Sequence, residues 1–136
     1  MTLGIVEAAR SWVGTPYRHR AALRGVGCDC IGLIRGVWAE VIGEAPTLPP
    51  YRADWRDGAH SAELRALAER WLVPGPMEPG AVLLFRIGAS MAPRHCGILV
   101  GEGRFVHAQE RLGVVEGNLG EGWAKRVAAI YRFPER

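Results

Sequence analysis

The stretch GCDCIGLIRGVWAEVIG, residues 27–43, is the clearest structural signal in the sequence. Its apolar residues recur at positions i, i+3, i+4 and i+7, which predicts an amphipathic helix over residues 30–42. Asp29 stands where an N-cap belongs, because its carboxylate can accept the unpaired N–H groups of the first turn. Gly43 stands where a glycine commonly ends a helix. The stretch therefore predicts one helix with Cys30 at its first position.

Helical patterns come before strand patterns along the rest of the chain. Apolar side chains repeat at helical spacing over residues 5–13, a proline-rich segment follows over residues 44–60, and Ser61 can cap a further helix through Leu72. From Gly80 onward we expect strands, at residues 81–87, 95–100, 104–109, 113–116 and 126–133. Helices followed by strands predict an α+β domain, with the helices packed on an antiparallel sheet of about five strands.

Length and composition limit the classes of protein to consider. The chain has 136 residues, which corresponds to a single domain over residues 1–136. Its net charge of +3 is too weak and too scattered to indicate nucleic-acid binding. No apolar run approaches the ~20 residues of a membrane span, so we expect no membrane insertion. Residues 1–12 lack the pattern of a secretory signal, so we expect synthesis in the cytoplasm without a signal peptide.

Cys30 is the candidate nucleophile. At a helix start the unpaired N–H groups and the helix dipole favour a thiolate, which is the form that attacks carbonyl groups. The alternative is that Cys30 only begins the apolar stripe of its helix, because free cysteines are usually core residues. Cys28 is either a packed small residue or a redox partner of Cys30. Cys96 is expected in the core, and the odd number of cysteines argues against a disulfide framework.

A thiol nucleophile needs a base, and His95 and His107 lie on two strands of one expected hairpin. Side chains alternate between faces along a strand, so the turn decides whether the two imidazoles meet. With an odd loop centred on Glu102, or a bulge, Gly97 opposes His107, and His95 lies diagonally from it on the same face. A two-residue turn would separate them. If they share a face, His95 takes the thiol proton, His107 fixes its tautomer, and the backbone N–H of Cys30 binds the oxyanion.

Four blocks of sequence resemble the NlpC-type cell-wall peptidases, a papain-like family that cleaves peptide bonds in bacterial murein. They occur in the family's order and spacing: SWVGTPYRHR (11–20), GCDCIGLI (27–34), EPGAVLLF (78–85) and RHCGILVGEGRFVHA (94–108). The resemblance implies that Cys30 is the nucleophile, His95 the base and His107 the third polar residue. It also implies that Tyr17 lies beside the nucleophile and that Asp29 helps to bind the substrate's amine.

The resemblance also implies a substrate and a setting. The wider family usually cleaves the bond between D-glutamate and a diamino acid such as diaminopimelate. A compact chain looks most like the branch carried by phage tails and gene transfer agents, which opens the wall for DNA entry. The expected partners are therefore peptidoglycan stem peptides and tail-tip or baseplate proteins, without a cofactor. We expect the protein to act in the periplasm or cell wall of the target cell.

Three departures from the family pattern stand out, and those at Ile31 and residues 18–20 concern substrate binding, whereas that at Ala81 is expected to have only a local effect. Ile31 stands where relatives carry a serine, Ala81 replaces an aspartate, and residues 18–20 replace an aromatic-glycine run. Arg18, Arg20 and Arg24 are candidates to pair with a substrate carboxylate.

Three alternatives to an endopeptidase remain open. The first is a zinc site, because several residues are of ligand type: Cys28, Cys30, His95, Cys96 and His107. Cys-x-Cys chelates poorly, however, and adjacent strand residues point to opposite faces, so we expect no metal. The second is an inactive structural tail-tip protein of the same fold, and the third is an N-acetylmuramoyl-L-alanine amidase. Trp55 and Trp123, in expected loops, are candidates to line a groove.

Overall fold

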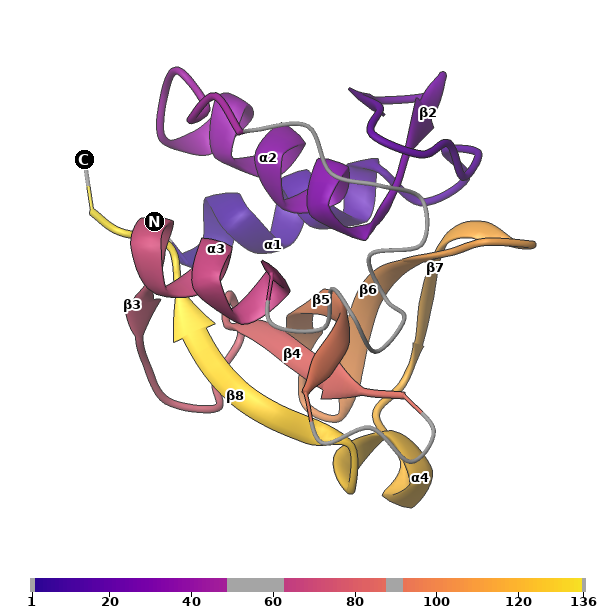
Figure 1. The fold of residues 1–136 in the computed structure, drawn as a ribbon. Coiled ribbons are helices and arrows are strands. Elements are labelled where there is room, and N and C mark those ends of the chain that lie inside the picture. Colours follow the sequence, from indigo (N-terminus) through magenta and orange to yellow (C-terminus); the bar gives the residue numbers. More distant parts are fainter. Residues whose placement is uncertain (1, 49–62, 88–91, 136) are drawn as a thin grey trace.

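The computed structural model describes residues 2–48, 63–87 and 92–135. Three helices lie on one side of an antiparallel sheet, namely α1 (Thr2–Ser11), α2 (Cys30–Val41) and α3 (Glu63–Trp71) (Figure 1). This arrangement confirms the α+β architecture expected from the sequence. The N-cap expected at Ser61, most of the segment 44–60 and Trp55 lie outside the described residues.

The sheet has six strands in the order β3-β8-β4-β5-β6-β7, one more than expected. Their bounds are β3 (Val73–Pro74), β4 (Val82–Arg86), β5 (Pro93–Gly101), β6 (Arg104–Gln109), β7 (Gly113–Asn118) and β8 (Val127–Arg132). All five expected strands are present, each within two residues of its expected ends. The additional strand, β3, has two residues and pairs only with β8 at the edge of the sheet. Two residues ending in a proline carry no alternation that sequence analysis could detect.

Three further short elements were not expected from the sequence. Within the loop before α2, β1 (Ala22–Leu23) and β2 (Gly27–Cys28) form a separate antiparallel pair. After β7, the chain makes one helical turn, α4 (Glu121–Ala124), before it enters β8. Figure 1 shows α4 on the side of the sheet away from α2.

Helix α2 begins and ends as its sequence predicts. The Asp29 carboxylate accepts from the Gly32 N–H, and Ile42 caps the carboxyl end. Two glycines let this helix pack closely. A Cβ at Gly32 would fall 1.8 Å from the carbonyl oxygen of Ala21, and one at Gly36 would fall 2.0 Å from Cζ2 of Trp12. Gly32 and Gly36 therefore let the loop before α2 and Trp12, just after α1, pack directly against α2.

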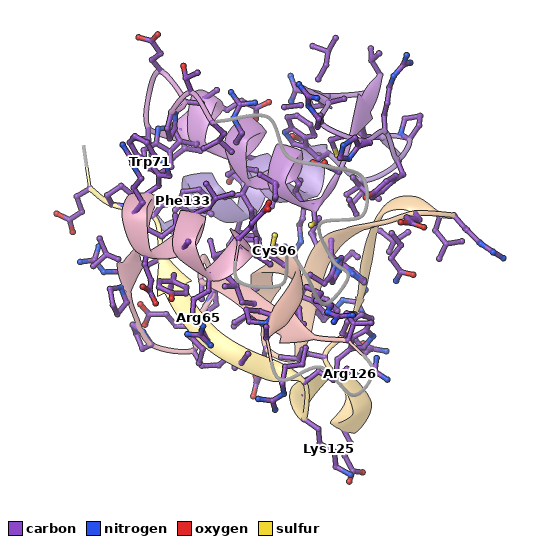
Figure 2. All side chains as sticks on the ribbon, in the orientation of Figure 1. Arg65, Trp71, Cys96, Lys125, Arg126 and Phe133 are labelled. Atoms are coloured by element: carbon purple, nitrogen blue, oxygen red, sulfur yellow. The ribbon has the colours of Figure 1, made fainter. Side chains whose placement is uncertain are left out.

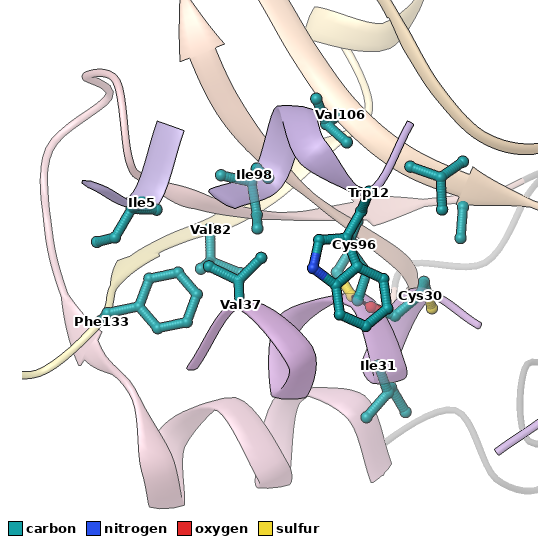
Figure 3. Close-up of a cluster of buried hydrophobic side chains, with 14 of the residues drawn as sticks. Ile5, Trp12, Cys30, Ile31, Val37, Val82, Cys96, Ile98, Val106 and Phe133 are labelled. Atoms are coloured by element: carbon teal, nitrogen blue, oxygen red, sulfur yellow. Dashed lines mark hydrogen bonds between the residues drawn. The ribbon is translucent and has the colours of Figure 1, made fainter. Parts of the chain in front are cut away.

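The core has one cluster on each face of the sheet. The larger cluster lies between the helices and the sheet, where Trp12, Val37, Cys96 and Ile98 are buried (Figure 3). A smaller cluster on the other face is formed by Ala81, Leu83, Phe85, Leu99 and Phe105 with Trp123 packed against it. Among the described residues, no helix is both long enough and apolar enough to span a bilayer.

Candidate active site

Cys30 is the first residue of α2 and only 3% of it is exposed. The loop before it is held by the buried Asp29, whose Oδ1 accepts from Gly32 N at 2.7 Å and whose Oδ2 accepts from Arg20 N at 2.8 Å. Arg20 has a φ of 65°, an uncommon conformation for a non-glycine residue, and this hydrogen bond stabilises it. The expected capping role of Asp29 is confirmed, and its two oxygens fix where the α2 N-terminus begins.

Cys96 connects the start of α2 to strand β5. Its Sγ donates to the carbonyl oxygen of Cys30 at 3.4 Å, an interaction visible in Figure 3. A hydrogen bond with the Cys30 side chain, followed by burial, raises the pKa of the Cys96 thiol well above its usual range. Cys96 is thus a protonated core residue, as expected, and its hydrogen bond holds the backbone of Cys30 against the residue that follows His95 on β5. Figure 2 shows Cys96 between the helices and the sheet.

His95 and His107 share a face of the sheet. Nε2 of His95 lies 2.8 Å from Nδ1 of His107, and the two rings meet edge to face at 71°. Strands β5 and β6 pair Ile98 with Val106, which is the register of an odd loop centred on Glu102. The register then shifts at Val100, between the Leu99 and Gly101 pairs. The structure therefore confirms the geometry that the functional interpretation requires, with a bulge completing the turn.

A second bulge lies immediately before His95. Phe85 pairs with His95, but Arg86 pairs with Pro93, so Arg94 is an extra residue on β5. A bulge bends its strand and changes the direction of the neighbouring side chains, and bulges are frequent beside active sites. This irregularity sits where β5 approaches the first turn of α2. The sequence does not indicate this bulge, because one extra residue leaves no mark in the alternation of side-chain types.

Aromatic rings enclose the two imidazoles. Phe105 stacks on His107 with centroids 4.2 Å apart, and Phe85 lies 5.9 Å from His95. Trp123 contacts both imidazoles, at 5.7 Å from His95 and 5.1 Å from His107. The expectation that Trp123 lies in a loop was wrong, since it belongs to α4. Its position depends on how α4 packs on the sheet, which local sequence does not indicate.

Burial determines the charge of His107, which is 1% exposed. Desolvation lowers the pKa of its imidazole to about 4, so His107 is neutral at pH 7. Its second ring nitrogen, Nε2, lies 3.2 Å from Nε2 of Gln109. Gln109 was not among the residues singled out from the sequence, although its position two residues after His107 places both side chains on one face.

Cys28 is fully buried beside the candidate nucleophile. Burial first, and then the charges of Asp29 and Cys30, raise the pKa of the Cys28 thiol to about 12. A thiol that stays protonated is a poor redox partner, so the structure favours the packing interpretation of Cys28. All three cysteines are free in the described structure.

The residues proposed for substrate binding lie in the loop before α2. Tyr17 is half-buried and forms a parallel bridge with Cys28, which places it against the segment that leads to Cys30. Arg24 contacts α1 and α2, with Nη1 3.0 Å from Ser11 Oγ and Nε 3.6 Å from Glu40 Oε1. Arg18 and Arg20 are exposed at the same loop. These two arginines, more than Arg24, remain candidates for a carboxylate.

The metal alternative has no structural support within the described ranges. No group of three or more histidine, cysteine, aspartate or glutamate side chains there is placed to hold a metal ion. What the described side chains do form is a cysteine at a helix N-terminus and two hydrogen-bonded imidazoles on the adjoining strands. This combination is suited to nucleophilic attack on a carbonyl carbon.

Comparison with known proteins extends these observations. The chain is 28% identical over 130 residues to the gamma-DL-glutamyl hydrolase of Bacillus subtilis, covering 95% of this chain and 29% of that protein. It is 28% identical over 134 residues to the Escherichia coli murein DD-endopeptidase MepS/murein LD-carboxypeptidase, covering 97% of this chain and 63% of that protein. The chain therefore spans less than two thirds of the length of either relative.

A solved structure shows the same fold. The NlpC/p60 domain of the peptidoglycan hydrolase SagA superimposes with a TM-score of 0.61 at 21% identity, covering 98% of both chains. The family model described as "NlpC/P60 family" matches residues 14–132, which include the α2 N-terminus and both imidazoles. Because this match covers most of the chain, the protein belongs to the NlpC/P60 family.

Proposed function

We propose that this protein is a cysteine peptidase that hydrolyses peptide bonds in peptidoglycan. Cys30 is the nucleophile, His95 the general base and His107 the residue that orients His95. The observation that carries the proposal is the 2.8 Å hydrogen bond between the two imidazoles. The residue after His95 on β5 is Cys96, whose thiol donates to the carbonyl oxygen of Cys30 at the start of α2. The relatives' names, a glutamyl hydrolase and a murein endopeptidase, support the substrate class.

The reaction follows from the roles of these groups. Nδ1 of His95, the nitrogen that the His107 hydrogen bond does not use, takes the proton of the Cys30 thiol, and the thiolate attacks the scissile carbonyl. The backbone N–H of Cys30 and the Tyr17 hydroxyl stabilise the resulting oxyanion. The His95 imidazolium then protonates the leaving amine, and a thioester remains on Cys30. His95 deprotonates a water that hydrolyses the thioester and restores the thiol.

The bond cleaved is the second part of the proposal. We propose the bond between D-glutamate and a diamino acid, with Asp29 or the loop arginines contributing to binding of the substrate's charged groups. The glutamyl specificity named for the Bacillus subtilis relative supports this choice. The DD-endopeptidase and LD-carboxypeptidase activities named for the Escherichia coli relative concern other bonds, so the products must be identified directly.

Mass spectrometry of murein fragments tests both parts. Purified murein is digested with the wild-type protein and with Cys30→Ala. A new free amine on the diamino acid, absent with Cys30→Ala, is the expected result. New lactyl-sugar ends would instead assign an amidase. If the wild-type protein produces no new ends, the alternative of an inactive structural protein of the same fold would be favoured.

We further propose that the enzyme is carried by a phage-like particle, docks on tail-tip or baseplate proteins, and acts in the periplasm or wall of the target cell. This part rests on the sequence resemblance described above. It predicts that the protein co-sediments with tailed particles from the producing culture. Recovery of the protein only in the soluble fraction, with none on purified particles, would contradict it.

A further inference from the structure

The hydrogen bonds of the site continue beyond His107 to Gln109. Both residues lie on β6, two positions apart, so their side chains share one face. Nδ1 of His107 is 2.8 Å from Nε2 of His95, and Nε2 of His107 is 3.2 Å from Nε2 of Gln109. The three side chains thus form a continuous chain that runs from the buried imidazoles to a half-buried amide.

The neutral state of His107 couples the two ends of this chain. Burial lowers the pKa of its imidazole to about 4, so at pH 7 the ring carries one proton. In a neutral imidazole one nitrogen donates a hydrogen bond and the other accepts one. Whatever bonds to Nε2 of His107 therefore decides whether Nδ1 donates to His95 or accepts from it.

The two possible directions have opposite consequences for His95. When the Gln109 amide nitrogen donates to His107, the proton of His107 sits on Nδ1 and points at Nε2 of His95. A neutral His95 then holds its own proton on Nδ1, where it cannot take a thiol proton. When the Gln109 carbonyl oxygen accepts the Nε2–H of His107, Nδ1 of His107 accepts from His95. Nδ1 of His95 then carries the lone pair that the chemistry needs.

A half-turn of the Gln109 amide interchanges these two arrangements. The structure places the amide nitrogen toward His107, and rotation about the terminal torsion puts the oxygen at the same position. The other neighbours of the imidazoles are mostly aromatic, and the Arg126 guanidinium lies 5.4 Å from the Trp123 centroid. Gln109 thus combines an acceptor and a donor at the solvent end of the chain.

We propose that Gln109 is a positioning residue whose carbonyl oxygen accepts the Nε2–H of His107 in the active state and thereby selects the tautomer of both imidazoles. This inference rests on the proposed roles of Cys30, His95 and His107. When the thiol proton moves to Nδ1 of His95, the imidazolium donates through Nε2 to Nδ1 of His107. The proton of His107 stays on Nε2, bonded to Gln109, so no proton has to leave the chain.

Two substitutions of Gln109 separate this role from packing. Gln109→Glu keeps the shape and can only accept, so it locks the proposed direction and adds a negative charge. Gln109→Met keeps the length but has only a weak acceptor, so it releases His107 from the chain. Arg111→Met, in the exposed turn two residues further on, is the matched control.

Nitrogen NMR of histidine-labelled full-length protein measures the tautomer of His107 directly. In the wild-type protein and in Gln109→Glu we expect Nε2 of His107 to be protonated and Nδ1 to be unprotonated. In Gln109→Met we expect signals that show a mixture of tautomers. The inference is overturned if His107 of the wild-type protein is protonated on Nδ1 under turnover conditions at pH 7. It is also overturned if His107 has the same tautomer in all three proteins.

The pH dependence of murein hydrolysis supplies the functional readout. The alkaline limb of the profile reports loss of the proton that His95 takes from the Cys30 thiol. Gln109→Glu should therefore move this limb to higher pH, and Gln109→Met should move it to lower pH. We expect Gln109→Met to lower kcat by about fivefold, the effect of one neutral hydrogen bond. If Gln109 only packed, the alkaline limb would stay at the wild-type pH in both variants. Any pattern other than opposite shifts of this limb contradicts the inference.

If Cys30→Ala retained full activity, the proposed function itself would fail. If Cys30→Ala were inactive and the Gln109 variants matched the wild type, only this inference would fail.

Discussion

Nε2 of His95 lies 2.8 Å from Nδ1 of His107, across the antiparallel strands β5 and β6. Strand β5 shifts in register against β6 after Leu99 and against β4 just before His95. The contact is diagonal, because Gly97 is the residue of β5 that opposes His107 in the register set by Ile98 and Val106. Aromatic rings pack around both imidazoles, so the hydrogen bond lies in an environment of low dielectric, where it is stronger than in water.

Replacing His107 tests the orienting role of this hydrogen bond. We expect His107→Ala to lower kcat for murein hydrolysis by about 100-fold, because His95 loses the partner that fixes its tautomer. His107→Asn should lose less, about tenfold, since an amide oxygen can take over as the acceptor. Steady-state kinetics on soluble murein fragments measures both. Equal activity of the alanine and asparagine variants would argue against an orienting hydrogen bond.

Trp123→Ala should raise the pKa of His107. The pKa lies at about 4 because burial disfavours the charged imidazolium, and removing the indole lets water reach the ring. The value should therefore move upward toward the ordinary 6.5 of histidine. An NMR titration of His107 measures the shift. Trp71→Ala, on α3, is the control and should leave the His107 titration unchanged. If Trp123→Ala also leaves it unchanged, Trp123 does not keep water from the pair.

Gly97→Ala should disrupt the His95–His107 pair without replacing any side chain of the proposed catalytic machinery. A Cβ at Gly97 would lie 2.9 Å from the carbonyl oxygen of Val106 and 3.0 Å from Cβ of His107. The strands must separate to accept it, at a cost of about 1–3 kcal/mol in the free energy of unfolding. Urea denaturation and kinetics measure the loss of stability and activity. Gly4→Ala, whose Cβ would meet Val41 Cγ1 at 3.8 Å, should leave activity intact. Wild-type stability in Gly97→Ala would show that this close approach is unimportant.

Cys28→Ala should leave hydrolysis unchanged under both reducing and oxidising conditions. The thiol of Cys28 stays protonated at neutral pH, because burial raises its pKa to about 12. Activity assays with and without a mild oxidant make the comparison. A wild-type enzyme that loses activity reversibly on oxidation, beside a Cys28→Ala variant that does not, would restore the redox interpretation of Cys28.

The sequence was sufficient for the parts of the fold that depend on local pattern. The helix starting at Cys30, its cap at Asp29 and the five longer strands follow from periodicity. The shared face of His95 and His107 was left open by the sequence, because it depends on the bulge at Val100 that offsets the two-residue turn. Elements of two to four residues, such as β3 and α4, have no periodicity to detect.

The surroundings of the site depended on long-range packing. Trp123 reaches the imidazoles only because α4, which connects β7 to β8, packs on the sheet face that carries Phe85 and Phe105. The bulge at Arg94 arises from pairing with β4, and one inserted residue does not alter the amino-acid pattern. Gln109 could have been found by extending the alternation of β6 two residues beyond His107. What the sequence lacked was the register between strands, which decides what each polar side chain meets.

The central claim is that His95 activates Cys30, and the rate of Cys30 alkylation as a function of pH tests it most directly. The wild-type protein, His95→Gln and the control Glu69→Gln, at an exposed position of α3, are treated with iodoacetamide, and modification of Cys30 is followed by mass spectrometry. An unassisted thiol becomes reactive near its ordinary pKa of about 8.5. We predict that at about pH 6 His95→Gln reacts about 100-fold more slowly than the wild-type protein and Glu69→Gln, because its thiol has no base to take the proton. Superimposable curves for wild type and His95→Gln would contradict the claim.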